Sequence, residues 1–119
     1  MVSRVIPVEP FDLAIFGASG DLAQRKILPG LFHRFAVGQM PEEARIIGVA
    51  RSEMDEVGFR AQVAESLAAF SPSAAGDAAL VATFLDKISY VTVDATGDNG
   101  WAELGAQLRD DVVRAFYLS

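Results

Sequence analysis

The chain has 119 residues, enough for a single domain that buries roughly two-thirds of the surface exposed by its unfolded chain. Hydrophobic residues make up 51% and charged residues 22% of it, as in ordinary globular proteins, and its net charge of −6 has the wrong sign for a nucleic-acid-binding surface. Cysteine is absent, which excludes disulfides and thiolate chemistry, and no apolar run approaches the roughly 20 residues of a membrane span. We therefore expect a cytoplasmic protein that binds neither nucleic acid nor membrane.

The first predicted elements are a buried strand and a helix. A continuous apolar run predicts a strand over 12–16, of the kind found in parallel sheets that are covered on both faces. Apolar side chains at helical spacing predict a helix over 21–37. Pro29 lies inside that helix and cannot donate a hydrogen bond to the Arg25 carbonyl, so we expect the helix to kink there.

Strands and helices alternate along the rest of the chain. After a strand over 45–50, Ser52, with Asp55 three residues on, is the predicted N-cap of a helix that runs to about residue 70. The remaining predicted elements are a short helix over 80–85, a strand over 87–93, a turn cluster over 94–100, a helix over 101–109 and a strand over 112–118. Four aromatic residues on apolar stripes are predicted to lie in the core: Phe59, Phe70, Phe84 and Trp101.

This order of elements predicts an α/β fold, because strands that alternate with helices form right-handed βαβ units around a parallel sheet. We expect residues 1–119 to form four strands, in the order 3-2-1-4, of a Rossmann-like doubly wound parallel sheet. The strand over 112–118 is then an edge that exposes Val113, Phe116 and Leu118, and an exposed apolar edge favours self-association.

The strand over 12–16 is followed at once by the sequence GASGDLA, residues 17–23. This matches a dinucleotide-binding turn of the form G-x-x-G-x-x-A. In such a turn Gly17 permits the tight turn, Gly20 lets the backbone approach a pyrophosphate, and Ala23 lets the helix pack closely on the strand. The amides at the N-terminus of the helix then face the phosphates.

Two polar side chains of this turn have alternative roles. Ser19 can donate its hydroxyl to a phosphate or cap the helix. For Asp21 a capping role is favoured, because its negative charge would repel a pyrophosphate. A glycine-containing loop that binds nothing remains the alternative for the turn as a whole.

The end of the second predicted strand favours NADP. An NAD enzyme usually places an acid there, or about 20 residues past the glycines, to bind the ribose 2′-hydroxyl, whereas an arginine nearby accommodates a 2′-phosphate. Here the strand ends in Ala50, Arg51 and Ser52, and none of these three residues before Glu53 is an acid. Arg51 can donate charge-assisted hydrogen bonds to the phosphate and stack on the adenine; its alternative is a solvated surface arginine.

The stretches GASGDLAQRKILP, RIIGVARS and ISYVTVDAT resemble the opening of glucose-6-phosphate dehydrogenases, and the resemblance covers essentially the whole chain. It is most specific in the first 52 residues, where G-D-L-A is followed by the K-x-x-P of Lys26 and Pro29. The resemblance implies that residues 1–119 are the first four strands and the N-terminal part of an incomplete NADP-binding domain, without its remaining elements and without the substrate domain. It also implies that the whole enzyme is a homo-oligomer of the pentose phosphate pathway. It would oxidise glucose 6-phosphate to 6-phosphogluconolactone with hydride transfer to NADP⁺, and NAD stays open as a second coenzyme because some members use both.

The resemblance also implies the coenzyme-binding residues. Arg51 matches the contact to the 2′-phosphate, and residues 17–24 match the backbone that cradles the pyrophosphate. Asp94 and Ala95 match adenine-side contacts, although a simple turn explains Asp94 equally well. The implied set is Gly17, Ala18, Ser19, Gly20, Asp21, Leu22, Ala23, Gln24, Arg51, Ser52, Asp94 and Ala95.

No catalytic residue is expected in this chain. In the resembling family the base and the sugar-phosphate contacts belong to a later segment of the type R-I-D-H-Y-L-G-K-E, so glucose 6-phosphate binding is expected only in the complete enzyme, and this chain alone is expected to be inactive. His33, the only histidine, lies roughly 18 Å along the helix from the glycines at about 1.5 Å per residue, and a packing or surface role is preferred. No metal site is expected, because this histidine has no partner ligand at useful spacing.

Two other functions stay open. An extended short-chain dehydrogenase or epimerase has a similar turn, but normally with Gly in place of Ala23 and with a Tyr-x-x-x-Lys pair that these 119 residues lack. The non-enzymatic alternative is an NADP-sensing module that binds the coenzyme without reacting.

Overall fold

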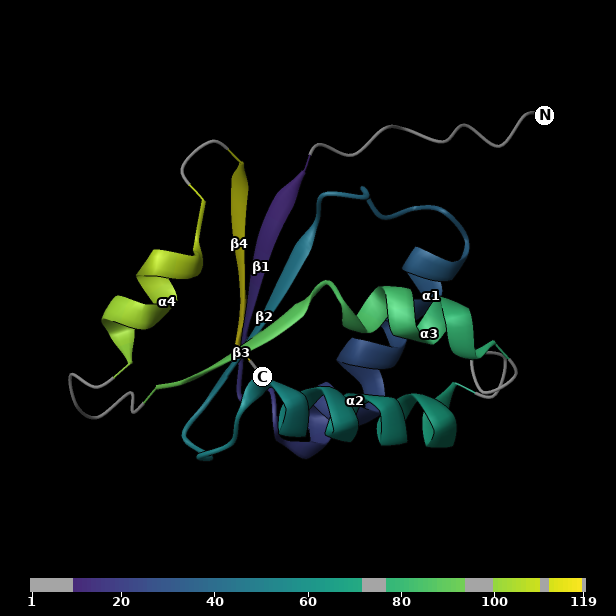
Figure 1. The fold of residues 1–119 in the computed structure, drawn as a ribbon, viewed down its shortest axis with the longest axis horizontal. Helices are drawn as coiled ribbons and strands as arrows, with labels where there is room; N and C mark the ends of the chain where they lie inside the picture. Colours follow the sequence, from purple (N-terminus) through teal and green to yellow (C-terminus); the bar gives the residue numbers. More distant parts are fainter. Residues whose placement is uncertain (1–9, 72–76, 94–99, 110–111, 119) are drawn as a thin grey trace.

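The computed structural model describes residues 10–71, 77–93, 100–109 and 112–118. Within these ranges, helices and strands alternate along the chain (Figure 1). They are β1 (Phe11–Phe16), the π-helical segment η1 (Ala23–Ile27), α1 (Leu28–Ala36), β2 (Arg45–Ala50), α2 (Glu56–Phe70), α3 (Ala78–Leu85), β3 (Ile88–Thr92), α4 (Trp101–Gln107) and β4 (Val113–Leu118).

The four strands form one parallel sheet in the order β3-β2-β1-β4, which confirms the predicted fold class and strand order. In the register of the sheet, Leu13 of β1 lies between Ile46 of β2 and Ala115 of β4. Helices α1, α2 and α3 cover one face, and α4 covers the other (Figure 1). The inner strands β1 and β2 are therefore buried on both faces, which explains why their sequences are almost continuously apolar.

An apolar cluster fills each of the two layers. The larger one lies between the sheet and the helices α1, α2 and α3 and includes the fully buried Phe59 and Phe84, as predicted. The smaller one consists of Ala14, Ile47, Val49, Val91, Val93 and Leu104. The predicted burial of Phe70 and Trp101 is wrong, since they are 43% and 42% exposed. Phe70 is the last residue of α2 and Trp101 is the first of α4, and a side chain at a helix end has packed neighbours on one side only.

Strand β4 is an edge of the described sheet, as predicted. Val113 and Phe116 are 51% and 56% exposed, and the Leu118 side chain lies outside the described residues. The Phe16 ring contacts the rings of Trp101 and Phe116, with centroid distances of 6.1 and 6.3 Å. Aromatic contacts thus join β1, α4 and β4 on this side of the molecule.

The helix predicted over 21–37 is present, but its segment Ala23–Ile27 has π-helical geometry. The Leu28 amide donates to the Ala23 carbonyl, five residues back, and Pro29 is the second residue of α1. A proline ring collides with a carbonyl four residues back in a regular helix. The wider π turn ahead of Pro29 accommodates this, so the predicted interruption takes the form of a π turn.

The predicted N-cap of α2 at Ser52 is wrong. The N-cap is Asp55, whose carboxylate accepts a hydrogen bond of 2.7 Å from the Gly58 amide. Similarly, Asp77 caps α3 by accepting a hydrogen bond of 3.0 Å from the Leu80 amide, so α3 begins earlier than predicted. Residues 51–54 therefore form a loop between β2 and α2, which we call the β2 loop.

A buried ion pair lies at the amino end of β1. Asp12 is fully buried, and its carboxylate accepts hydrogen bonds from the Arg109 backbone amide at 2.7 Å, from Nε at 3.0 Å and from Nη2 at 2.7 Å. Nη2 also donates to the carbonyls of Phe11 and Glu43. Arg109 can make these contacts because α4 ends at Gln107, two residues earlier than the predicted end of that helix. The pair ties the chain after α4 to β1 and to the segment before β2.

Gly48 of β2 lies against the ring of Phe59. A Cβ atom at position 48 would lie 2.6 Å from Cε2 and Cζ of that ring, which is fully buried. Gly48→Ala is therefore expected to lower the free energy of unfolding by about 1–3 kcal/mol, the usual cost of overpacking a core. Urea unfolding measures this, with Gly105→Ala as the control, because a Cβ atom there meets nothing within 4 Å. Equal stability of the two variants would contradict the prediction.

Candidate functional site

Residues 17–24, which we call the glycine turn, join β1 to the following helix. Gly17 has φ of 76°, a conformation that favours glycine. The amides of Gly17 and Ala18 donate to the Val49 carbonyl of β2 at 2.8 and 3.2 Å, and the Gly20 amide donates to the Gly17 carbonyl at 2.9 Å. A Cβ atom on Gly20 would lie 3.1 Å from that same Gly17 oxygen. The two glycines therefore permit a tight turn that is anchored on β2.

Side chains brace the glycine turn from the side of α2. The Gln24 side-chain amide donates to the Ala18 carbonyl at 2.8 Å, and the Ser66 hydroxyl donates to Gln24 Oε1 at 2.6 Å. The Gln62 side-chain amide donates to the Ser19 carbonyl at 3.1 Å. Gln24 is only 6% exposed, so its side chain supports the turn from within. The sequence alone did not point to Gln62 and Ser66. Their spacing was the one indication, because two polar residues four apart lie on the same face of a helix, and on a packed face such side chains need hydrogen-bond partners.

The other positions of the glycine turn differ in exposure. Ala18 and Ala23 are fully buried, in keeping with the close packing predicted for Ala23, whereas Leu22 is 44% exposed. The capping role favoured for Asp21 is not observed. Its carboxylate lies 3.6 Å from Arg25 Nε and makes no other polar contact with the described residues.

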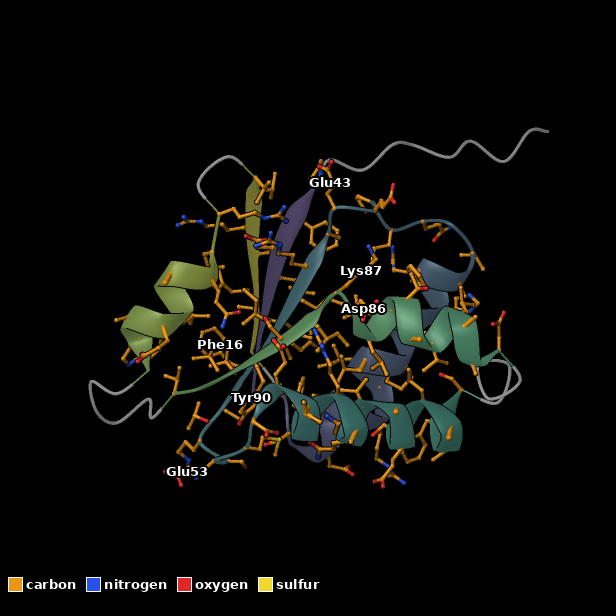
Figure 2. All side chains as sticks on the ribbon, in the orientation of Figure 1. Phe16, Glu43, Glu53, Asp86, Lys87 and Tyr90 are labelled. Carbon is orange, nitrogen blue, oxygen red and sulfur yellow. The ribbon has the colours of Figure 1, made fainter. Side chains whose placement is uncertain are left out.

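A pocket of about 540 Å³ opens at the carboxyl edge of the sheet, next to the glycine turn. Gly17, Ser19, Arg51 and Ser52 line it, so the structure brings together predicted site residues from the ends of β1 and β2. The rest of its lining is Phe16, Val49, Ala50 and Val93. Figure 2 shows Glu53 and Tyr90 toward this end of the sheet. Ligands of open α/β sheets bind at this edge, outside the carboxyl ends of the strands.

The β2 loop places Arg51 and Ser52 at this pocket. The Arg51 side chain is exposed and makes no ion pair or hydrogen bond with any residue that the structure describes. The Ser52 hydroxyl lies 3.1 Å from the Ser19 hydroxyl, so the β2 loop contacts the glycine turn. The Ser52 carbonyl accepts a hydrogen bond of 2.5 Å from the hydroxyl of Tyr90, a residue that the sequence reasoning also missed. The pocket thus places the exposed guanidinium of Arg51 next to the glycine turn.

Some predicted residues lie elsewhere. Asp94 and Ala95 fall outside the described residues, so the structure does not place them. His33 is exposed on α1 and does not line the pocket, in agreement with a surface role.

In the ranges that the structure describes, no group of three or more His, Cys, Asp or Glu side chains is arranged to hold a metal ion. Nor does any helix in those ranges have the length and apolar character needed to cross a membrane.

Comparison with known proteins identifies the family. Residues 14–119 match a family model described as glucose-6-phosphate dehydrogenase, NAD binding domain. The glucose-6-phosphate 1-dehydrogenase of Rhizobium meliloti (strain 1021) is 42% identical over 121 residues, which cover 100% of this chain and 25% of the relative. The enzyme of the same name from Gluconobacter oxydans (strain 621H) is 41% identical over 94% of this chain and 24% of the relative.

The same fold occurs in a solved structure described as glucose-6-phosphate dehydrogenase in complex with its substrate glucose-6-phosphate. The TM-score is 0.79 and the sequence identity is 33%, and the match covers 100% of this chain and 25% of the chain in that structure. The chain therefore spans about a quarter of the length of these relatives. None of these matches favours a short-chain dehydrogenase or epimerase. The chain belongs to the glucose-6-phosphate dehydrogenase family and matches that family's dinucleotide-binding domain.

Proposed function

We propose that this chain binds NADP⁺ at the carboxyl edge of its sheet, as the coenzyme-binding part of an enzyme that oxidises glucose 6-phosphate to 6-phosphogluconolactone. The observation that carries the proposal is the pocket in which Arg51 and the glycine turn meet. Family membership supports the reaction and the substrate. The proposal includes a cytoplasmic, homo-oligomeric whole enzyme, with NAD⁺ as a weaker second coenzyme.

The pyrophosphate is assigned to the glycine turn. The amides of Gly17, Ala18 and Gly20 already donate to protein carbonyls, so we assign the phosphates to the neighbouring amides of Ser19, Asp21 and Leu22. The helix dipole favours an anion at this position. The absence of a Cβ atom on Gly20 supports the assignment, because it leaves the backbone open to close approach. Ala23 and Gln24 support the turn from the buried side.

The adenosine end is assigned to the β2 loop. Arg51 offers a guanidinium to the 2′-phosphate, and among the described residues no carboxylate lines the pocket to bind a 2′-hydroxyl in its place. Ser52 lies beside it at the same rim. The adenine-side role of Asp94 and Ala95 remains part of this proposal. Together these residues favour NADP⁺ over NAD⁺.

The work of this chain is to bind and orient the coenzyme. When bound, NADP⁺ supplies the hydride acceptor through its nicotinamide ring. The apolar side chains Phe16, Val49 and Val93 restrict water at the pocket wall, and the braced glycine turn holds the phosphate donors in place. We assign no proton-transferring residue in this chain, because its only histidine, His33, lies away from the pocket.

An activity assay of the full-length protein tests the proposal. NADPH formation, followed by its near-ultraviolet absorbance, is expected to require glucose 6-phosphate, and calorimetric titration is expected to give tighter binding of NADP⁺ than of NAD⁺. The His33→Ala variant is expected to keep full activity. Binding of NADP⁺ without NADPH formation would indicate the sensor module instead, and a protein that binds neither coenzyme would refute the proposal.

A further inference from the structure

One hydroxyl group reaches the backbone on both sides of Arg51. The Tyr90 hydroxyl lies 2.5 Å from the Ser52 carbonyl oxygen and 3.3 Å from the Ala50 carbonyl oxygen. These are the carbonyls of the residues immediately before and after Arg51 in the sequence. The chain therefore bends around the Tyr90 hydroxyl, with Arg51 at the middle of the bend.

The two carbonyls depend on Tyr90 to different degrees. The Ala50 carbonyl also accepts a hydrogen bond of 2.9 Å from the Val93 backbone amide, as part of the pairing between β2 and β3. Among the described residues, the Ser52 carbonyl has only side-chain donors, which are Tyr90 at 2.5 Å and Thr92 Oγ1 at 3.3 Å. Removal of the Tyr90 hydroxyl therefore leaves the Ser52 end of the bend held only by the longer hydrogen bond from Thr92, while the Ala50 end stays attached to the sheet.

The Tyr90 ring is held rigidly. Tyr90 is 8% exposed, and its ring centroid lies 4.8 Å from that of the fully buried Phe59. Burial raises the pKa of the Tyr90 hydroxyl above its ordinary value, although the hydrogen bond with Thr92 opposes this. The hydroxyl therefore keeps its proton at neutral pH and acts as a preorganised donor to the β2 loop.

The geometry points to Tyr90 as a positioning residue that sets the coenzyme preference of the site by holding the β2 loop so that Arg51 faces the 2′-phosphate of NADP⁺. This inference rests on the proposed function. Tyr90 does not line the pocket, so it acts on the coenzyme through the backbone around Arg51. NAD⁺ lacks the 2′-phosphate, so its affinity is expected to depend little on the Tyr90 hydroxyl.

Calorimetric titration of the full-length Tyr90→Phe variant tests the inference, because this change removes the hydroxyl and keeps the ring on Phe59. We expect NADP⁺ binding to weaken about three- to tenfold, which corresponds to one net hydrogen bond, and NAD⁺ binding to change less than about twofold. Tyr117→Phe is the matched control, because it removes the same atom from an exposed side chain that does not line the pocket. It is expected to leave both affinities unchanged.

A double-mutant cycle separates positioning from a general structural effect. If Tyr90 acts through Arg51, Tyr90→Phe has no further effect on NADP⁺ affinity in an Arg51→Ala background. If Tyr90→Phe does not fold, Thr92→Val removes the weaker donor to the same carbonyl and is expected to lower the NADP⁺ to NAD⁺ preference in the same direction by a smaller factor.

Two kinds of result overturn the inference, and they are distinguishable. An unchanged coenzyme preference in Tyr90→Phe, or an equal loss in the Arg51→Ala background, refutes the role of Tyr90 alone and leaves the proposed function intact. A wild-type protein that binds neither coenzyme refutes the proposed function as well.

Discussion

Replacement of Asp12 by alanine is expected to lower the free energy of unfolding by about 3 kcal/mol. Loss of one partner from a buried ion pair typically costs about 3–5 kcal/mol, because the other charge is left without compensation. The lower end applies here, since the Arg109 side chain is 22% exposed and keeps the Phe11 and Glu43 carbonyls as acceptors. Urea unfolding followed by circular dichroism measures the change.

A surface ion pair provides the matched control. Glu56 lies 3.5 Å from Arg60 at the start of α2, and both side chains are partly exposed. Glu56→Ala is expected to cost less than about 1 kcal/mol, because solvent screens exposed pairs. If Asp12→Ala destabilises the protein no more than Glu56→Ala does, the buried pair makes no special contribution to stability.

The same ion pair predicts a dependence of stability on pH. Burial raises the pKa of the Asp12 carboxyl, but the hydrogen bonds and the positive charge of Arg109 outweigh it and hold the pKa below its ordinary value of 3.8. The contribution of the pair is therefore fully present above this ordinary value and is lost as the pH falls through the lower pKa of the folded state. Unfolding free energies measured from neutral to acidic pH are expected to fall less steeply in Asp12→Ala than in the wild type.

Arg51→Ala is expected to weaken NADP⁺ binding by about 1.5–3 kcal/mol, or roughly 10- to 150-fold, and to leave NAD⁺ binding nearly unchanged. The reason is the loss of charge-assisted hydrogen bonds to the 2′-phosphate, which NAD⁺ lacks. Arg51 makes no ion pair or hydrogen bond with the described residues, so its removal disturbs no polar contact among them. Calorimetric titration of the full-length protein with each coenzyme measures both affinities.

The control for net charge is Arg34→Ala, which removes a positive charge from an exposed position on α1 that does not line the pocket. It is expected to leave the preference for NADP⁺ unchanged. An Arg51→Ala protein that binds both coenzymes as tightly as the wild type would remove Arg51 from the site, and an equal loss in Arg34→Ala would indicate only a general electrostatic effect.

The sequence alone was sufficient to predict the element types, the strand order and the location of the pocket. Continuous apolar runs bounded by turn residues predicted the strands, and their alternation with helices leaves few arrangements besides a right-handed parallel sheet. The glycine turn could be read locally, because the positive φ of Gly17 follows from the steric freedom of glycine. The position of Arg51 next to the glycine turn could also be predicted, because the carboxyl ends of neighbouring parallel strands lie at the same edge of a sheet.

Only the tertiary structure decided which side chains hold the β2 loop, the glycine turn and the end of β1 in place. Helix α2 begins at Glu56, after the Asp55 cap, and the hydroxyl of Tyr90, 38 residues further along than Ser52, donates to the Ser52 carbonyl in the loop before that helix. The brace from Gln62 to the glycine turn spans 43 residues, and the pair between Asp12 and Arg109 spans 97. A local pattern reports the conformation of its own segment and the face that it buries. It carries no information about the partner of a polar side chain far away in the sequence, because that partner is chosen by the packing of the whole sheet and its helices.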